Sequence, residues 1–285
     1  VAQGMALFAR ALTAAGARRI AMEDPSSAPG RAQLTSNGLE ILPIPVDEDG
    51  LRTEALEEVA VGAVMITPAH QFPLGVVLAP ERRAALLDWA ARAGAVVLED
   101  DYDAEYRYDR QPVGAVQGLA PELVAYAGSA SKTLAPGLRL GWLVVPERLI
   151  HPVTAAKESD DLGTPVVEQL ALADFLERGE LDRHLRRTRS IYRERRDILV
   201  GALARLLPHC PPAGVAAGLH LVVRLPSGTD EQAVLDAARS RGLGISGISE
   251  HRMEPGPPAL LLGYGRIAEP AIEPAVQALA DSLRA

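Results

Sequence analysis

The sequence predicts an α/β fold: a mostly parallel sheet flanked by helices, followed by a smaller C-terminal α+β unit. Continuous apolar runs, such as residues 61–67 and 95–98, alternate with helical segments through the first half of the chain. Strands that are apolar along their whole length are typical of parallel sheets covered on both faces. Beyond Pro165 the pattern changes to long helices and then to short strands between helices. We therefore expect a large domain over residues 1–160, connecting helices over 161–207 and a small domain over 208–285.

The first half of the chain supplies the predicted parallel sheet. Residues 2–15 read as a helix because Met5, Phe8 and Leu12 fall on one face. Residues 47–50 form an acidic turn that ends in glycine. The predicted strands are 19–23, 39–46, 61–67, 95–98, 123–127 and 138–145, and the other predicted helices are 53–59 and 80–93.

The second half supplies the connecting helices and the small unit. A linker rich in proline separates the two parts at residues 208–214. The predicted helices are 166–178, 181–207, 231–241 and 269–283, and the predicted strands are 219–225, 245–248 and 259–263.

The composition describes an acidic chain with a sizeable core. The 285 residues carry a formal net charge of −8, and 48% of them are hydrophobic. An acidic surface repels DNA phosphates, and acidic residues interleave with the arginines of helix 181–207. We therefore expect a solvated helix face there, and no specific operator binding by this chain alone. The single cysteine, Cys210, cannot form an internal disulfide and favours a reducing cytoplasm. The sequence has no apolar run of membrane-spanning length, no signal peptide pattern and no Cys/His spacing typical of zinc.

Lys132 is the candidate catalytic residue. It follows the apolar run 123–127, with Ser129 and Ser131 beside it and Arg139 seven positions later. A lysine held in such a pocket can form a Schiff base with an aldehyde. Hydroxyl groups and the donor fork of an arginine can hold a phosphate. These are two demands of pyridoxal phosphate, which also needs a partner for its ring nitrogen.

An acidic segment, residues 99–106, follows the buried strand 95–98 and offers that partner. The Asp100 carboxylate can pair with a protonated pyridine nitrogen, which keeps the ring an electron sink. Tyr102, two residues later, can reach the phenolic oxygen of the ring. Without the lysine segment downstream, a solvated acidic turn would be the better interpretation.

Two further segments are weaker candidates for the same site. His70 lies on a loop, residues 67–75, that follows a strand and is bounded by proline and glycine, as a pocket wall can be, and it is a candidate effector ligand. Ala2 and Gln3 open the first helix, where free backbone N–H groups and the helix dipole suit a phosphate.

Six segments carry a family resemblance: residues 23–25, 45–51, 67–75, 99–108, 131–141 and 192–197. They resemble fold-type I pyridoxal-phosphate proteins of the aspartate aminotransferase kind. More narrowly, they are similar to the aminotransferase-like domain of MocR-type regulators, a branch of the GntR transcription factors. The resemblance covers nearly the whole chain, and the segments 67–75 and 99–108 separate this branch from ordinary aminotransferases.

The resemblance implies a seven-stranded large domain and a role for each site residue. Lys132 would carry the cofactor as a Schiff base, Asp100 would pair with the pyridinium, and Tyr102 would bond the ring oxygen. The phosphate would lie at or near Ser129, Ser131 and Arg139 and the backbone of Ala2 and Gln3.

The resemblance also implies partners. Such regulators bind DNA through an N-terminal winged helix-turn-helix, and they form head-to-tail homodimers through the aminotransferase-like domain. That domain senses pyridoxal phosphate, or an amine or amino acid joined to it. This chain opens inside a predicted helix, so we expect it to be the effector and dimerisation part of a longer regulator. The winged helix and the first segment of the fold would precede Val1.

The sequence departs from the family pattern at two places. The Glu-Asp-Pro segment is normally followed by an aromatic residue near the cofactor, whereas residues 26–29 here are Ser-Ser-Ala-Pro. The family often has a Ser-Arg pair that clamps a substrate carboxylate, whereas here Ser249 is followed by Glu250. Arg252 or Arg266 could replace that arginine as an effector ligand. Otherwise the effector is not an ordinary amino acid.

The residues leave three functions open. The first is the regulator's effector domain, the second is a working aminotransferase, and the third is a dimerisation scaffold that has lost the cofactor. The chemistry of Lys132 permits the first two, and the branch-specific segments favour the regulator. The missing aromatic residue is the reason to consider the scaffold.

Overall fold

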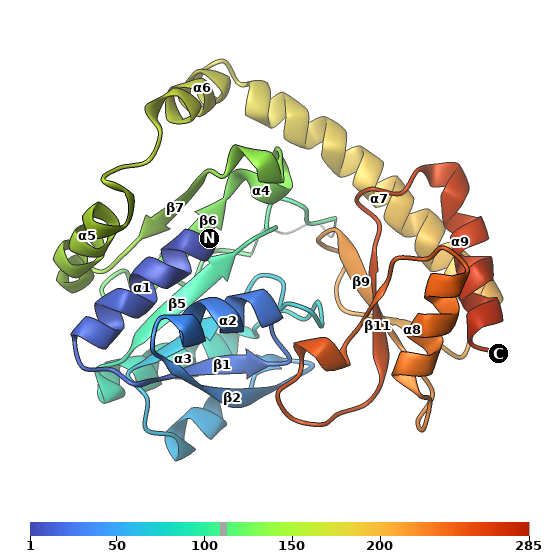
Figure 1. Cartoon of the computed structure of the whole chain (residues 1–285), viewed down its shortest axis with the longest axis horizontal. Helices are drawn as coiled ribbons and strands as arrows, with labels where there is room; N and C mark the ends of the chain where they lie inside the picture. The colour runs from blue at the N-terminus through green and yellow to red at the C-terminus, as the bar shows by residue number, and fades with distance from the viewer. Residues whose placement is uncertain (109–112, 285) are drawn as a thin grey trace.

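The computed structural model describes residues 1–108 and 113–284 and contains two separate sheets (Figure 1). The larger has seven strands in the order β3-β2-β1-β4-β5-β6-β7. Its inner strands are parallel, and the edge strands β3 and β7 run antiparallel to their neighbours. The prediction of a mostly parallel seven-stranded sheet is confirmed. The strands are β1 (Arg19–Asp24), β2 (Glu40–Asp47), β3 (Gly50–Leu51), β4 (Ala63–Ile66), β5 (Val96–Asp101), β6 (Val124–Ser129) and β7 (Gly141–Val144).

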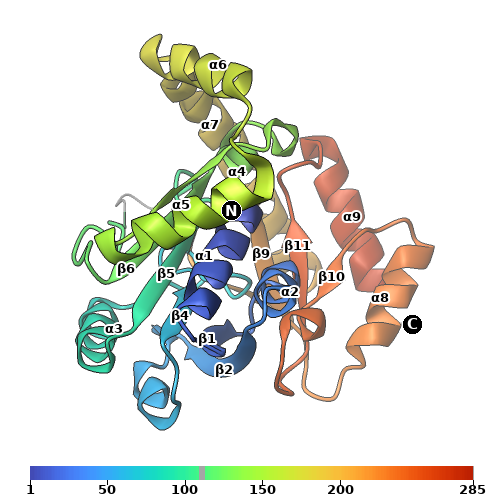
Figure 2. The ribbon, with the colours of Figure 1, turned by 60° about the vertical axis from the view of Figure 1, so that its left-hand side comes forward.

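Helices cover both faces of this sheet, as apolar parallel strands require. One core cluster joins α1 to alternate strand residues such as Ile20 and Met22, and the other joins α3 to the intervening residues such as Ala21. In Figure 2, α5 crosses over α1, and the Arg10 side chain on α1 is ion-paired with Asp160 on α5. The first face carries α1 (Ala2–Ala14), α2 (Ala28–Ser36) and α5 (Glu147–Asp161), and the second carries η1 (Thr53–Glu58) and α3 (Pro80–Ala93).

Two of these helices were not predicted. The α2 helix begins at Ser27, whose hydroxyl accepts a hydrogen bond from the backbone N–H of Gly30 at 3.2 Å. The serines that stand where the family has an aromatic residue are therefore part of a helix start, with Ser27 as the N-cap. The α5 helix has one buried side chain, Leu149, and contains Pro152. An apolar face that narrow gives almost no periodic signal.

The second half of the chain forms the smaller, antiparallel sheet, with strand order β10-β11-β9-β8. Its core gathers side chains such as Val223 and Leu260 from the sheet, Leu203 from α7 and Val276 from α9. The elements are α6 (Val166–Glu177), α7 (Glu180–Leu206), β8 (Pro212–Ala213), β9 (His220–Arg224), α8 (Glu231–Ser240), β10 (Ser246–Gly247), η3 (Ser249–His251), β11 (Ala259–Gly263) and α9 (Glu269–Ser282).

The α7 helix joins the two parts of the molecule (Figure 1). In its first half, the His184 ring is hydrogen-bonded at 2.8 Å to the carbonyl of Thr133, beside the lysine segment. In its second half, Leu199 and Leu203 pack in the core of the small sheet. Within the described residues, none of the helices has both the length and the apolar character that a bilayer crossing needs.

Candidate functional site

The carboxyl ends of β1, β4, β5 and β6 enclose a cavity, which is where open parallel sheets bind ligands. The cavity holds about 790 Å³ of empty space, counting its open mouth. The small sheet closes it from the other side with Leu219 and His220. Strand ends and one helix start supply the rest of the wall: Met22, Glu23, Ser26, Ser27, Met65, Ile66, Thr67, Phe72, Asp100, Tyr102, Asp103 and Lys132.

Lys132 lies on the short helix α4 (Ala130–Thr133), directly after β6. The Ser129 hydroxyl caps this turn by accepting a hydrogen bond from the Ser131 N–H at 3.0 Å. The Thr133 carbonyl accepts hydrogen bonds from the Tyr106 hydroxyl at 3.3 Å and the His184 ring at 2.8 Å. The turn is therefore held from both ends, while the lysine side chain remains exposed at the cavity.

Asp100 is a buried carboxylate that lines the same cavity. Side chains alternate between the two faces of the sheet along β5, so Asp100 lies with Val96 and Leu98 on the face that α1 covers. Glu99 lies on the opposite face, where its carboxylate accepts hydrogen bonds from the backbone N–H groups of Val116 and Gln117. Asp100 is 9% exposed, and its Oδ1 has no hydrogen-bond partner among the described residues. Burial raises the pKa of Asp100 to about 7. A buried polar atom without a partner is costly in a native protein, so this carboxylate calls for a donor from a ligand.

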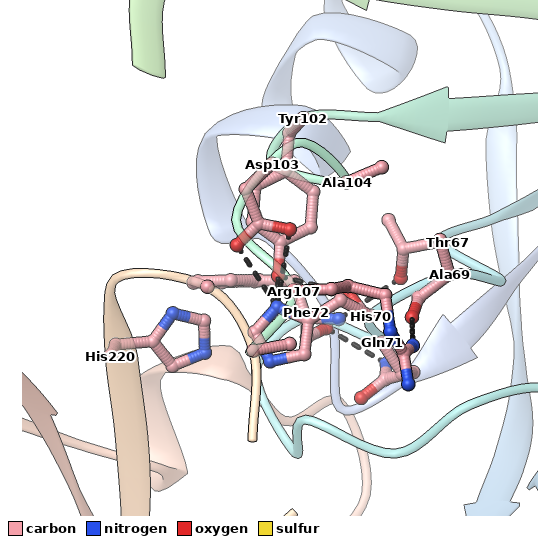
Figure 3. Close-up of polar contacts among 12 residues, drawn as sticks. Thr67, Ala69, His70, Gln71, Phe72, Tyr102, Asp103, Ala104, Arg107 and His220 are labelled. Atoms are coloured by element: carbon pink, nitrogen blue, oxygen red, sulfur yellow. Dashed lines mark hydrogen bonds and ion pairs between the residues drawn. The ribbon is translucent and has the colours of Figure 1, made fainter. Parts of the chain in front are cut away.

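Tyr102 is held by His70, which in turn is held by Asp103 (Figure 3). The Tyr102 hydroxyl donates to the His70 carbonyl at 2.9 Å. The His70 Nδ1 lies 2.9 Å from Asp103 Oδ2 and 3.0 Å from the Tyr102 hydroxyl. His70 is 3% exposed and does not line the cavity. The structure therefore gives His70 a supporting position behind Tyr102, not the effector contact that the sequence suggested.

The small sheet approaches this cluster closely at Gly218 and His220. The His220 ring lies 5.1 Å from the His70 ring, and Phe72 stands edge-on to it. Burial lowers the pKa of His220 to about 3, so the ring is neutral. Gly218 has a φ of +70°, and a Cβ there would lie 2.3 Å from Cε1 of His70. Only glycine permits this backbone to pass so near the ring.

Glu23 is a second buried carboxyl group in the cavity wall, and sequence reasoning missed its role. Its Oε2 accepts hydrogen bonds from the Thr67 hydroxyl at 2.6 Å, the Thr67 N–H at 3.0 Å and the Gln71 amide at 3.3 Å. Burial raises the pKa of Glu23 to about 7, although these hydrogen bonds oppose the shift. The signal was available, because Glu23 stands at the end of a buried strand just as Asp100 does.

The start of α1 lies beside the predicted phosphate residues. A Cβ on Gly141 would lie 3.2 Å from the Val1 nitrogen and 3.8 Å from the Ser129 Cα, so these three residues are neighbours. The pKa of the Val1 amine is lowered, mainly by burial. The nearby Arg139 charge adds to this shift, and the nearby Asp100 charge opposes it. Arg139 is exposed and adopts the left-handed backbone conformation, with a φ of 54°. Such strain in a non-glycine residue is common at ligand sites.

The two arginines that were predicted as effector ligands lie elsewhere. Arg252 donates to the Pro257 carbonyl at 3.3 Å and lines a different cavity, together with Arg224. Arg266 lines a third cavity, between β11 and α9. Neither belongs to the wall that contains Lys132. The loop that follows Ser249 turns away toward α2, where its backbone binds Asp24 and Arg31.

A mixed seven-stranded sheet, with a lysine after β6 and a buried carboxylate at the end of β5, defines a cofactor-binding protein of the aminotransferase class. The family described as aminotransferase class I and II matches residues 2–260. The chain belongs to this family.

Relatives of two kinds are similar to the chain. The uncharacterized HTH-type transcriptional regulator YhdI of Bacillus subtilis (strain 168) is 34% identical over 92% of this chain. The probable rhizopine catabolism regulatory protein MocR of Rhizobium meliloti is 33% identical over 93% of it. The chain spans only 56% and 54% of their respective lengths. Among solved structures, the kynurenine aminotransferase of Pyrococcus horikoshii matches 99% of this chain, and 73% of its own chain, with a TM-score of 0.91 and 27% identity.

Pyridoxal phosphate is the cofactor of this family, and the cavity fits it. The unpartnered Oδ1 of Asp100 is a buried acceptor that a protonated ring nitrogen would satisfy. Lys132 lines the same cavity, and Tyr102 and Phe72 supply aromatic side chains to its wall. Burial raises the pKa of Tyr102 well above its ordinary value, so its hydroxyl keeps its proton.

Proposed function

We propose that this chain is the effector-sensing and dimerisation domain of a MocR-type, GntR-family DNA-binding transcription regulator. It would hold pyridoxal phosphate as a Schiff base on Lys132, and the whole protein would act in the cytoplasm. The division into a large domain (1–160), connecting helices (161–207) and a small domain (208–285) is part of this proposal. DNA would be bound by a winged-helix domain outside this chain.

One observation supports the proposal that the chain binds pyridoxal phosphate: Lys132 and the unpartnered carboxylate of Asp100 line the same cavity. Pyridoxal phosphate, when bound, supplies an aldehyde that captures amines and a ring that withdraws electrons. Asp100 would hold the proton on the ring nitrogen, and Tyr102 would bond the ring oxygen in place of its donation to the His70 carbonyl. Ser129, Ser131, Arg139 and the N–H groups of Ala2 and Gln3 would hold the phosphate.

An absorbance spectrum tests the attachment, because the sequence contains only two lysines, Lys132 and Lys157. The purified protein with pyridoxal phosphate should show a visible Schiff-base band that Lys132→Ala abolishes. Lys157→Ala is the matched control, since Lys157 is ion-paired with Asp161 on α5 and does not line the cavity. A band that is unchanged in Lys132→Ala would place the Schiff base on another amine, whereas the absence of any band in the parent protein would favour the cofactor-free scaffold.

A homodimer accounts for the exposed apolar side chains near the site. In α6 no residue is buried, and Val167 and Leu170 are 76% and 64% exposed. Apolar patches of this kind mark protein interfaces. We group the large exposed apolar residues that lie on or beside η2 (Pro136–Leu138), β7, α5 and α6 as the proposed dimer surface. They are Leu138, Trp142, Val144, Ile150, Leu162, Val166, Val167, Leu170 and Leu176.

The oligomeric state can be measured by light scattering on a sizing column. We expect a dimer for the parent chain and a monomer for Leu170→Glu, because a charge would be buried in the interface. Leu119→Glu is the control, since Leu119 is 66% exposed but lies outside this set of elements. A Leu170→Glu protein that remains dimeric would show that α6 is not in the interface.

A working aminotransferase is the second candidate, favoured by the similarity to the Pyrococcus horikoshii enzyme. The two functions differ in turnover. A transaminase converts excess amino donor and keto acid to products catalytically, whereas a sensor binds its ligand without net product. Sustained product formation that is lost in Lys132→Ala would decide for the enzyme.

A further inference from the structure

The described wall of the Lys132 cavity is acidic. Its ionisable side chains are the carboxyl groups Glu23, Asp100 and Asp103, the amine of Lys132 and the neutral imidazole of His220. It contains no arginine among the described residues. Asp100 lines this cavity, is more than nine-tenths buried, and has no hydrogen-bond partner for its Oδ1 among the described residues. Once Lys132 and Asp100 serve the cofactor, the ionisable side chains left to meet an effector are the carboxyl groups of Glu23 and Asp103 and the neutral His220.

Arg139 is assigned above to the cofactor phosphate, and three other arginines, Arg31, Arg252 and Arg266, are occupied or line other cavities. Arg31 donates to the carbonyls of Ser26 at 2.7 Å, His251 at 2.7 Å and Glu250 at 3.0 Å, so its guanidinium holds the η3 loop. Arg252 and Arg266 line the two other cavities described above. None of these three guanidinium groups is positioned to bind a carboxylate beside Lys132.

Glu23 presents a fixed acceptor to the cavity. All three of its hydrogen-bond donors, two from Thr67 and one from Gln71, are bonded to Oε2. The other oxygen, Oε1, accepts no hydrogen bond from the described residues. It is not fully buried either, and Glu23 lines the cavity, so Oε1 is accessible from the cavity. The neighbouring wall is apolar, with Met22, Met65 and Ile66 beside it.

We propose that the effector is a short aliphatic diamine that lacks a carboxylate. One of its amines would replace the Lys132 amine on the cofactor aldehyde, so that Lys132 is released as a free amine, and the other would bind Oε1 of Glu23. This inference rests on the proposed sensor function and specifies its ligand class. The hydrocarbon linker lies along the methionine and isoleucine side chains, and the second ammonium forms a charge-assisted hydrogen bond with Glu23. A carboxylate in that place would face Glu23 with no arginine among the described wall residues to compensate, which is discrimination by repulsion as well as by attraction.

Three probes of equal chain length test the proposal on the cofactor-loaded protein. They are putrescine, γ-aminobutyrate and n-butylamine, titrated by calorimetry and by the change in the visible band. We expect putrescine to bind at least about tenfold more tightly than γ-aminobutyrate, with butylamine between them. In Glu23→Gln the preference for putrescine over butylamine should fall below about threefold, because the charge of the acceptor is lost. Lys157→Ala should preserve the preference.

The outcomes separate this inference from the proposed function. If no visible band forms, the sensor proposal fails before any amine is added. If the band forms and γ-aminobutyrate binds as tightly as putrescine, the ligand class is wrong while the sensor stands. Failure of putrescine to bind the loaded protein also overturns the inference. The wild-type series needs no variant, so a Glu23→Gln protein that does not fold leaves the test intact.

Discussion

Replacing Asp100 with asparagine removes a carboxyl group that the fold buries without a partner. Burial raises the pKa of Asp100 from 3.8 to about 7. A shift of about 3 units corresponds to about 4 kcal/mol of differential stability between the protonation states. Because the folded-state pKa is raised, this contribution is fully present below the unfolded value of 3.8 and is lost as the pH rises through about 7.

The assay is urea unfolding of the cofactor-free protein across a pH series. The free energy of unfolding of the wild type should fall, relative to Asp100→Asn, by about 4 kcal/mol between about pH 4 and about pH 8. Glu23 titrates in the same window and its charge also raises the pKa of Asp100, so the difference between the two curves reports Asp100 together with its coupling to Glu23. Asp88→Asn, on the exposed side of α3, is the control and should run parallel to the wild type.

The same variant has an opposite consequence for the cofactor. A protonated ring nitrogen gives Asp100 its missing donor, and hydrogen bonds to charged groups contribute about 1.5–3 kcal/mol. Pyridoxal phosphate should therefore bind Asp100→Asn about ten to a hundred times more weakly than the wild type. Parallel stability curves for wild type and variant would refute the reasoning, because they would mean that Asp100 is ionised and already compensated.

Three further substitutions have defined outcomes. Gly218→Ala should cost about 2–4 kcal/mol in urea unfolding because its Cβ meets His70 at 2.3 Å, whereas Gly228→Ala, with a φ of +82° but open space, should cost only about 1–2 kcal/mol. Arg31→Ala removes three hydrogen bonds to backbone carbonyls, so amide exchange in residues 249–254 should accelerate; unchanged exchange would mean that Arg31 does not hold the loop. Thr67→Val removes the 2.6 Å hydrogen bond to Glu23 and should raise the pKa of Glu23 further, as read from its carboxyl resonance; a lowered pKa would contradict this account.

Much of the fold could be predicted because its signals are local. The helix predicted at 80–93 is α3 (Pro80–Ala93), residue for residue, since its apolar periodicity and its leading proline agree. The inner strands were found because parallel strands are apolar along their length. The α5 helix could not be found this way, because it buries only Leu149. Val153 is only partly buried beside it and Ile150 is exposed, so the apolar periodicity of this helix is weak.

In the site, too, some residues could be predicted from local sequence signals and others could not. Lys132 and Asp100 follow buried strands directly, so strand order brings them to one cavity, and both could be found from the sequence. The effector ligands could not, because the positions of Arg252 and Arg266 depend on how the small sheet docks. His70 looked like a wall residue and instead supports Tyr102, since its ring is taken up by Asp103 and covered by Gly218. Such contacts join residues far apart in the chain and leave no periodic trace.

The α7 helix has a mechanical consequence. Its 27 residues at 1.5 Å per residue make a rod about 40 Å long, one end of which touches the carbonyl beside Lys132 while the other is embedded in the small sheet. A rod of that length turns a small rotation into a large displacement, because a tilt of about 5° at one end moves the other end by about 3–4 Å. A small displacement of the turn that carries Lys132 would therefore become a larger displacement in the small sheet.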